Sequence, residues 1–229
     1  MTLYETIFVR RSVRKYDMTP LDEKTLADIG AFLDAADRMP GQTARFEIAP
    51  AGSVKGMQAP HYILAYCGVD AGACANAGYV LGGCDLYIQS LGLGSVFLGM
   101  AKPIQKSDDY RIMLAFGKSD APLRAGEGDF SRLPLHEISA EDNPVIRAAR
   151  LAPSAMNSQP WKFECADGLV AVRYFGRGLT KLLIRNMNKI DVGIASRHAA
   201  VALRESGKDV ISVTPKADGK ELAVEIRYK

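Results

Sequence analysis

The chain has 229 residues, of which 48% are hydrophobic and 24% are charged, and its formal net charge is +3. Such a composition is ordinary for a globular protein with a sizeable core, and it argues against a disordered chain. The basic residues form no run of the kind that binds nucleic acid, and no segment is as long and apolar as a membrane span. We therefore expect a cytoplasmic protein with a small-molecule substrate and neither a nucleic-acid nor a membrane partner.

The four cysteines argue against a metal site. They show neither the Cys-x-x-Cys spacing nor the histidine partners that zinc sites use. Buried, reduced thiols are the expected state, because free cysteine behaves as a small hydrophobic residue. The residues concerned are Cys67, Cys74, Cys84 and Cys165.

The first part of the chain alternates helices and strands. Thr2 and Glu5 form a capping box that predicts a helix from Leu3 to about residue 10. A second helix is expected from Thr19, with proline in its first turn, to about residue 37. Patterning predicts strands at 46–49, 61–67, 95–98 and 111–116 and an apolar helix at 75–91. Glycine destabilises an exposed helix, so three glycines in this last helix predict close packing on that face: Gly78, Gly82 and Gly83.

The second part repeats the mixture of elements. Asn143 followed by proline predicts a helix that reaches about residue 151. Two short strands at 161–165 and 169–175 should form a hairpin across an Asp-Gly turn. A helix at 189–206 and a strand pair at 210–214 and 222–228 follow. This element order predicts an α+β fold.

A polar loop in the second part, between its first helix and first strand, has the composition of a ligand-binding segment. Residues 152–163 read Ala-Pro-Ser-Ala-Met-Asn-Ser-Gln-Pro-Trp-Lys-Phe and contain the only tryptophan. Loops of this kind, held between regular elements, often carry function. Asn157 and Gln159 suit the carbonyls and ring nitrogens of a flat heterocycle, and Pro153 and Ser154 can approach a ring edge closely. The alternative is a loop that only caps its own backbone.

A basic cluster follows the first helix. Arg10, Arg11, Ser12 and Arg14 suit one phosphate group, because guanidinium binds phosphate oxygens in pairs. The alternative is a solvated surface. The sequence shows no Ser-His-Asp or Gly-x-Ser-x-Gly arrangement and no convincing nucleophile. A redox cofactor would supply the missing chemistry.

The two parts also resemble each other. Residues 36–47 can be aligned with 149–164, and the spacing from Gly78 to Gly92 equals that from Gly193 to Gly207. We interpret the chain as a degenerate duplication with halves 1–139 and 140–229 that pack as a pseudo-dimer within one chain. Chance similarity between two helix-strand units is the alternative. Only the first half has the arginine cluster, and only the second has the long loop.

Four segments together resemble the FMN-dependent nitroreductase superfamily, most closely the branch with two nitroreductase-like halves in one chain. They are residues 10–16, 91–99, 131–135 and 152–161. The resemblance implies mixed or antiparallel sheets with packed helices, FMN as the cofactor and NAD(P)H as the electron donor. It places the arginines and Ser12 at the phosphate and ribityl chain, the long loop at the isoalloxazine, and backbone amides near Gly99 at the reactive nitrogen. The cofactor-binding residues that it implies are Arg10, Arg11, Ser12, Arg14, Gly99, Met100, Arg132, Pro153, Ser154, Ala155 and Asn157.

The implied activity is ping-pong hydride transfer from NAD(P)H through FMN to a nitroaromatic, quinone or similar acceptor, with no catalytic side chain. Two alternatives stay open: a flavin-binding carrier or sensor without efficient turnover, and a phosphate-ligand module without flavin. The loop after Pro40 is short, and no arginine cluster precedes Pro144. We therefore expect one FMN per chain and an intrachain pseudo-dimer, which leaves open whether a second subunit is needed.

Overall fold

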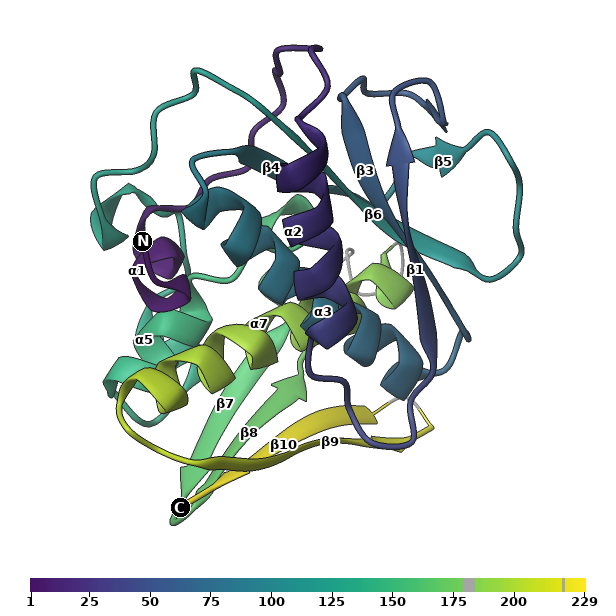
Figure 1. Ribbon diagram of the computed structural model, residues 1–229. Coiled ribbons are helices and arrows are strands. Elements are labelled where there is room, and N and C mark those ends of the chain that lie inside the picture. Colours follow the sequence, from purple (N-terminus) through teal and green to yellow (C-terminus); the bar gives the residue numbers. More distant parts are fainter. Residues whose placement is uncertain (179–183, 220) are drawn as a thin grey trace.

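The computed structural model describes residues 1–178, 184–219 and 221–229. Two four-stranded antiparallel sheets lie on either side of two long central helices, α3 (Ala71–Ser90) and α7 (Arg185–Glu205) (Figure 1). The main hydrophobic core contains residues from both sheets and both helices. The α+β class and the antiparallel sheets with packed helices are as expected.

Both sheets have the same topology. In each, the first two strands form a hairpin, a long helix follows, and the fourth strand inserts between the second and the third. The order in the first sheet is β1 (Ala44–Pro50), β3 (His61–Cys67), β6 (Tyr110–Gly117) and β4 (Gly94–Leu98). The order in the second is β7 (Trp161–Ala166), β8 (Leu169–Tyr174), β10 (Glu221–Tyr228) and β9 (Val210–Asp218).

The remaining elements surround this frame. Helices α1 (Leu3–Val9) and α5 (Pro144–Arg150) pack at one end of the central pair, and α2 (Glu23–Ala35) packs on α3. A ribbon of β2 (Val54–Lys55) and β5 (Lys102–Pro103), the short helix α4 (Leu135–Ile138), and 3-10 turns at Glu127–Asp129 and Ala155–Asn157 complete the described elements.

The central helices approach each other to backbone contact. A Cβ atom on Gly78 would lie 2.0 Å from the carbonyl oxygen of Ile190, and one on Gly193 would lie 1.9 Å from that of Ala75. Real Cβ atoms do not come this close, so both positions require glycine. The expectation of close packing on the glycine face of this helix is confirmed.

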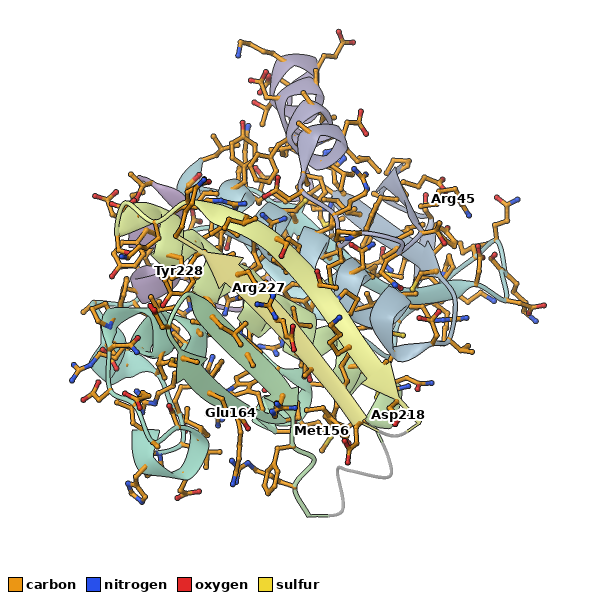
Figure 2. The ribbon with its side chains drawn as sticks, turned by 90° about the horizontal axis from the view of Figure 1, so that it is seen from below. Arg45, Met156, Glu164, Asp218, Arg227 and Tyr228 are labelled. Carbon is orange, nitrogen blue, oxygen red and sulfur yellow. The ribbon has the colours of Figure 1, made fainter. Side chains whose placement is uncertain are left out.

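The two sheets differ in how they are covered. Strand β3 is buried along its whole length, because a second hydrophobic cluster containing Tyr62 and Met113 covers the outer face of its sheet. In the second sheet β7 alternates between buried and exposed residues. The outward face of the second sheet carries exposed side chains such as Glu164 on β7 and Arg227 on β10 (Figure 2). No helix in the described part of the chain has the length and apolar character needed to cross a membrane.

Helix starts differ from expectation more than strands do. The Thr2 capping box is present, whereas α2 begins at Glu23 with Asp22 as its cap, and not at Thr19. The reason is tertiary: the backbone N–H of Leu21 donates to Nε2 of His61 at 2.9 Å and holds the preceding residues outside the helix. Helices α3 and α7 both begin four residues before their expected starts, and in α3 Asp70 supplies the cap.

Candidate functional site

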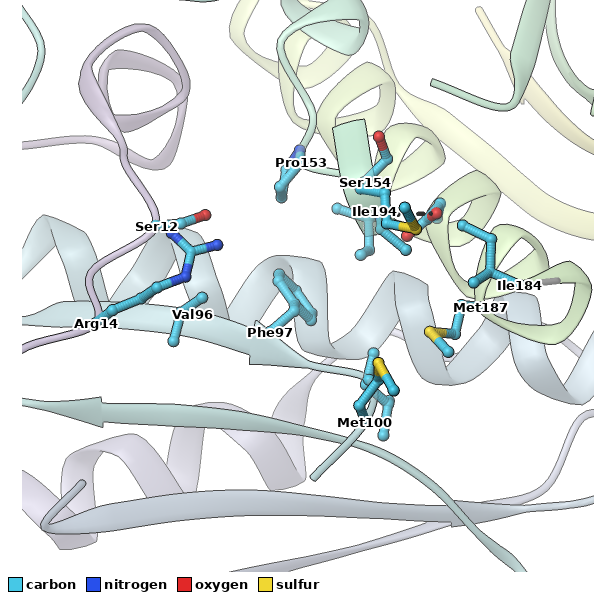
Figure 3. A pocket seen from close by; sticks show the side chains of 15 residues that line it. Ser12, Arg14, Val96, Phe97, Met100, Pro153, Ser154, Ile184, Met187 and Ile194 are labelled. Atoms are coloured by element: carbon cyan, nitrogen blue, oxygen red, sulfur yellow. Dashed lines mark hydrogen bonds between the residues drawn. The ribbon is translucent and has the colours of Figure 1, made fainter. Parts of the chain in front are cut away.

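A mostly apolar cavity of about 190 Å³ lies between β4, the long loop and one face of α7 (Figure 3). Helix α7 contributes Met187, Asp191 and Ile194, whose spacing puts them on one side of the helix. Ile184, which immediately precedes the helix, lines the same wall. Three further walls come from β4, from the segment that follows it, and from the loop. Their lining residues include Val96, Phe97, Gly99, Met100, Pro153, Ser154, Ala155 and Met156.

A basic cavity of about 480 Å³ adjoins the apolar one. The two share five lining residues: Ser12, Arg14, Pro153, Ser154 and Met156. The basic cavity is lined by five arginines and one carboxylate, namely Arg10, Arg11, Arg14, Arg124, Arg132 and Asp129. In Figure 3, Ser12 and Arg14 lie at one end of the apolar cavity, and Met187 and Ile184 lie at the other. The combined site is therefore apolar at one end and cationic at the other.

The pKa of Arg132 is lowered far below the usual range of an arginine. Burial, followed by the nearby charges of Arg10, Arg124 and Arg150, lowers the pKa of Arg132 to about 9. Its Nη1 donates to Oδ1 of Asn157 at 2.8 Å, and its Nη2 to the carbonyl oxygen of Leu151 at 3.0 Å. Its Nε is buried without a hydrogen-bond partner among the described residues. An anion bound at this end would relieve the repulsion between these cations.

Arg10 is held inside the protein. Its side chain is 2% exposed, and its Nε lies 2.8 Å from Oδ2 of Asp85 on α3. The other oxygen of Asp85 accepts hydrogen bonds from Ser95 Oγ at 2.6 Å and Gln89 Nε2 at 3.0 Å. Gln89 also accepts from the backbone N–H of Arg11 at 2.9 Å. This network fixes the arginine segment against α3 and β4, so Arg10 serves at least as an anchor for the basic end.

The long loop is held in an uncommon backbone conformation. Met156, Asn157 and Gln159 have φ values of 53°, 54° and 47°, in the left-handed region that non-glycine residues rarely adopt. Such residues persist only where the surroundings determine them. Here the N–H of Gln159 donates to Ser154 Oγ at 2.9 Å, and the N–H of Leu133 donates to Gln159 Oε1 at 2.8 Å. The loop is thus a rigid wall of both cavities.

The expected binding residues gather at these two cavities. Each of the eleven lines one cavity or both. The amides of Asn157 and Gln159 are used within the protein, mostly to join the loop to the segment 131–133: Asn157 Nδ2 donates to the carbonyl oxygen of Ser131 at 3.0 Å, while Gln159 Nε2 donates within the loop to the carbonyl oxygen of Asn157 at 3.3 Å. Contact of these eleven residues with FMN stays a prediction.

The sequence analysis missed several residues of the site, of which Asp191 is the most unusual. It is buried in the wall of the apolar cavity, and its Oδ2 accepts a hydrogen bond from the N–H of Ala155 at 3.1 Å. Burial raises its pKa well above that of an ordinary carboxyl group. The sequence offered one indication of Asp191: when Gly78 is aligned with Gly193, Asp191 takes the same position as Asn76, so both helices carry a polar residue there. Other missed lining residues are Phe97, Arg124 and Met187.

Comparison with known proteins identifies the family. The sequence model of the family described as Putative TM nitroreductase matches residues 2–203. A solved structure described as a putative nitroreductase from Thermotoga maritima aligns with 99% of this chain and 94% of its own, at 20% identity and a TM-score of 0.73. A nitroreductase family protein from Clostridium difficile 630 aligns with 62% of this chain and 99% of its own, at 20% identity and a TM-score of 0.51. No curated protein matches the sequence.

At these identities the structural alignments establish similarity of fold alone. The family match is stronger evidence of kinship, because it extends over most of the sequence. The chain belongs to the Putative TM nitroreductase family.

Proposed function

We propose that the protein is an FMN-dependent NAD(P)H oxidoreductase of the nitroreductase type, which passes electrons in a ping-pong cycle to a nitroaromatic, quinone or similar acceptor. The observation that carries the proposal is the junction of an apolar cavity with a cluster of arginines. FMN has the matching shape, with a flat ring at one end and a phosphate at the other. When bound, it would supply the hydride chemistry.

The residues present fit this group. Arg14 and Arg132 are suited to the phosphate, since burial and the neighbouring cations lower the pKa of Arg132 and a bound dianion would offset both effects. Phe97 and Met187 are suited to the ring, because both line the apolar cavity. Gly99 leaves room there: a Cβ on it would lie 2.5 Å from Sδ of Met187. The protein's contribution is to bind, orient and exclude water.

We also propose that the halves 1–139 and 140–229 arose by duplication and form a pseudo-dimer within one chain. Three observations support this. The sheets share one topology. The glycine contacts of α3 and α7 are reciprocal, since each glycine faces the residue three positions before the other. The site has walls from both halves, with Arg14 from the first and Ser154 from the second. A monomer would then hold a complete site.

A single FMN per chain follows from the asymmetry of the halves. In the helix alignment, Tyr79 takes the position of the cavity residue Ile194. The guanidinium of Arg197 lies 3.8 Å from the centre of the Tyr79 ring and donates to the carbonyl oxygen of Asp37 at 3.0 Å. A cavity of about 210 Å³ lies beside the short loop at Pro40, but its lining includes the ion pair of Asp37 with Arg204 and lacks the arginine cluster that adjoins the apolar cavity.

The test is to purify the protein, record its absorbance spectrum and titrate it with FMN. We expect one FMN per chain, bleaching of the flavin on anaerobic mixing with NADPH or NADH, and return of colour on adding a nitroaromatic or a quinone. A colourless protein that binds no added FMN would refute the proposal. FMN binding without bleaching by either donor would favour the carrier or sensor. Light scattering of the FMN-loaded protein tests the monomer.

A further inference from the structure

The carboxyl group of Asp191 occupies an unusual place in the apolar cavity. The residue is 3% exposed, and one of its oxygens accepts the N–H of Ala155 at 3.1 Å. No other hydrogen bond or ion pair to this carboxyl occurs within the described ranges. A buried carboxylate without a cation is costly, so burial favours the protonated form. Its pKa is raised well above the usual range because of burial.

The corresponding position on α3 shows that a carboxyl group is not needed for the fold. Asn76 is likewise buried, and its Oδ1 accepts the backbone N–H of Met39 at 2.8 Å. The amide of Asn76 therefore holds the segment that leads into the first sheet. The carboxyl group of Asp191 holds the segment that leads into the second sheet in the same way. What the carboxyl adds is a second oxygen that can carry a dissociable proton, in the wall of a cavity.

The charges that face Asp191 are few. The described lining of the cavity includes one other titratable side chain, Arg14, from the segment after α1. Neither the lining residues from β4 and β6 nor those from the long loop carry a titratable side chain. On α7 itself, Met187 and Ile194 line the cavity without charge, and the neighbouring Lys189 is buried and does not line it.

We propose that Asp191 is a protonated hydrogen-bond donor to the ring of the ligand, and that it ceases to donate when it ionises at higher pH. This inference rests on the proposed function, since it takes the flavin ring as the ligand of the apolar cavity. The oxygen bonded to Ala155 acts as the acceptor, and the other carries the proton toward a carbonyl oxygen or ring nitrogen. An ionised carboxylate offers only acceptor atoms, so ionisation would leave two acceptors facing each other.

Asp191→Asn is the informative variant, because an amide can accept from Ala155 and still donate into the cavity without titrating. Asp191→Ala removes the donor. Asp120→Asn is the matched control, since Asp120 is exposed and far in sequence from the site. Riboflavin is the probe, because it carries the flavin ring without the phosphate, whose own titration would confuse the result.

The first measurement is riboflavin affinity between pH 6 and 9. We expect the wild-type protein and Asp120→Asn to lose up to about tenfold in affinity per pH unit above the ionisation of Asp191. Asp191→Asn should bind within about threefold of wild type at pH 6 and show no such loss. Asp191→Ala should bind about tenfold more weakly at pH 6. If Asp191→Ala binds as tightly as wild type, or Asp191→Asn keeps the wild-type pH profile, the donor role is wrong.

The second measurement needs no ligand. An infrared difference spectrum between the wild-type protein and Asp191→Asn at pH 7 should contain the C=O stretch of a protonated carboxylic acid. A carboxylate band alone would overturn the inference even if flavin binds and is reduced. Absence of flavin binding by all four proteins would instead refute the proposed function, and with it the donor role. The two failures are therefore distinguishable.

Discussion

Gly78 of α3 lies so close to Ile190 of α7 that there is no room for a side chain: a Cβ atom on Gly78 would lie 2.0 Å from the carbonyl oxygen of Ile190. The contact between Gly193 and Ala75 repeats it with the helices exchanged, at 1.9 Å. Helix α7 contributes Met187, Asp191 and Ile194 to the apolar cavity, and β4 follows α3 along the chain. The tight crossing therefore fixes the position of α7, the helix that carries one wall of the site.

Gly78→Ala should destabilise the protein by at least about 2 kcal/mol. The added methyl group meets backbone, which cannot rotate away, so the helices must separate, and overpacking of this kind outweighs the helix propensity that alanine gains. Gly193→Ala should have a similar effect. Urea unfolding monitored by circular dichroism measures both.

Gly30→Ala is the matched control for this pair. Gly30 also lies in a helix, α2, but a Cβ there would make an ordinary contact at 3.8 Å with the side chain of Ile48. Alanine at this position should be neutral or stabilising by up to about 1 kcal/mol. Equal unfolding midpoints for Gly78→Ala and Gly30→Ala would show that the helix crossing is not as tight as described.

Much of this fold could be predicted from local sequence patterns. The strand at 61–67 and the hairpin around Gly168 were predicted from an apolar run and a turn residue, and Gly168 has the positive φ of 67° that favours glycine. The start of α2 was predicted wrongly, because Thr19 was the expected cap and the actual cap, Asp22, was placed within the first turn. The choice between them depends on the hydrogen bond from Leu21 to His61, forty residues away.

The site was predictable in its residue types and less so in their contacts. The arginine cluster and the long loop were recognised because guanidinium groups and small polar residues have limited uses in such patterns. The pairing of Arg10 with Asp85 depends on how α3 packs, so no local pattern reveals that this arginine is an internal anchor. Asp191 was overlooked for a related reason: its burial depends on how α7 packs against β4 and the long loop, which are distant in the sequence.

Arg132→Gln should weaken FMN binding by at least about tenfold and reduce the stabilisation that inorganic phosphate gives. The variant removes a cation from the cluster while keeping an amide that can donate to Asn157. Fluorescence titration with FMN, and the shift in melting temperature on adding phosphate, measure the two effects. Arg173→Gln is the control, because Arg173 is exposed and pairs with Glu164 on the outward face of the second sheet. If phosphate stabilises both variants equally, the basic cavity is not the anion site.

Asp85→Asn should cost about 3 to 5 kcal/mol of stability, because it leaves the guanidinium of Arg10 buried without a counter-charge. Glu164→Gln breaks an exposed ion pair with Arg173 and should cost less than about 1 kcal/mol. Chemical unfolding of both variants at pH 7 compares them. A loss in Asp85→Asn no greater than that in Glu164→Gln would mean that Arg10 finds another partner or reaches water.

His198 should make the protein less stable in acid. Burial, followed by the charge of Arg10, lowers the pKa of His198 to about 3, while the unfolded chain keeps the ordinary value of about 6.5. Below pH 6.5 the unfolded chain therefore binds a proton that the folded protein excludes, so stability falls as the pH drops from 6.5 toward 3. The slope is up to about 1.4 kcal/mol per pH unit.

Melting temperatures between pH 4 and 7 should show this decline in the wild-type protein and a shallower one in His198→Asn, whose amide cannot gain the proton. His136→Asn, at an exposed position, serves as the control and should follow the wild type. Parallel curves for wild type and His198→Asn would mean that other groups cause the acid sensitivity.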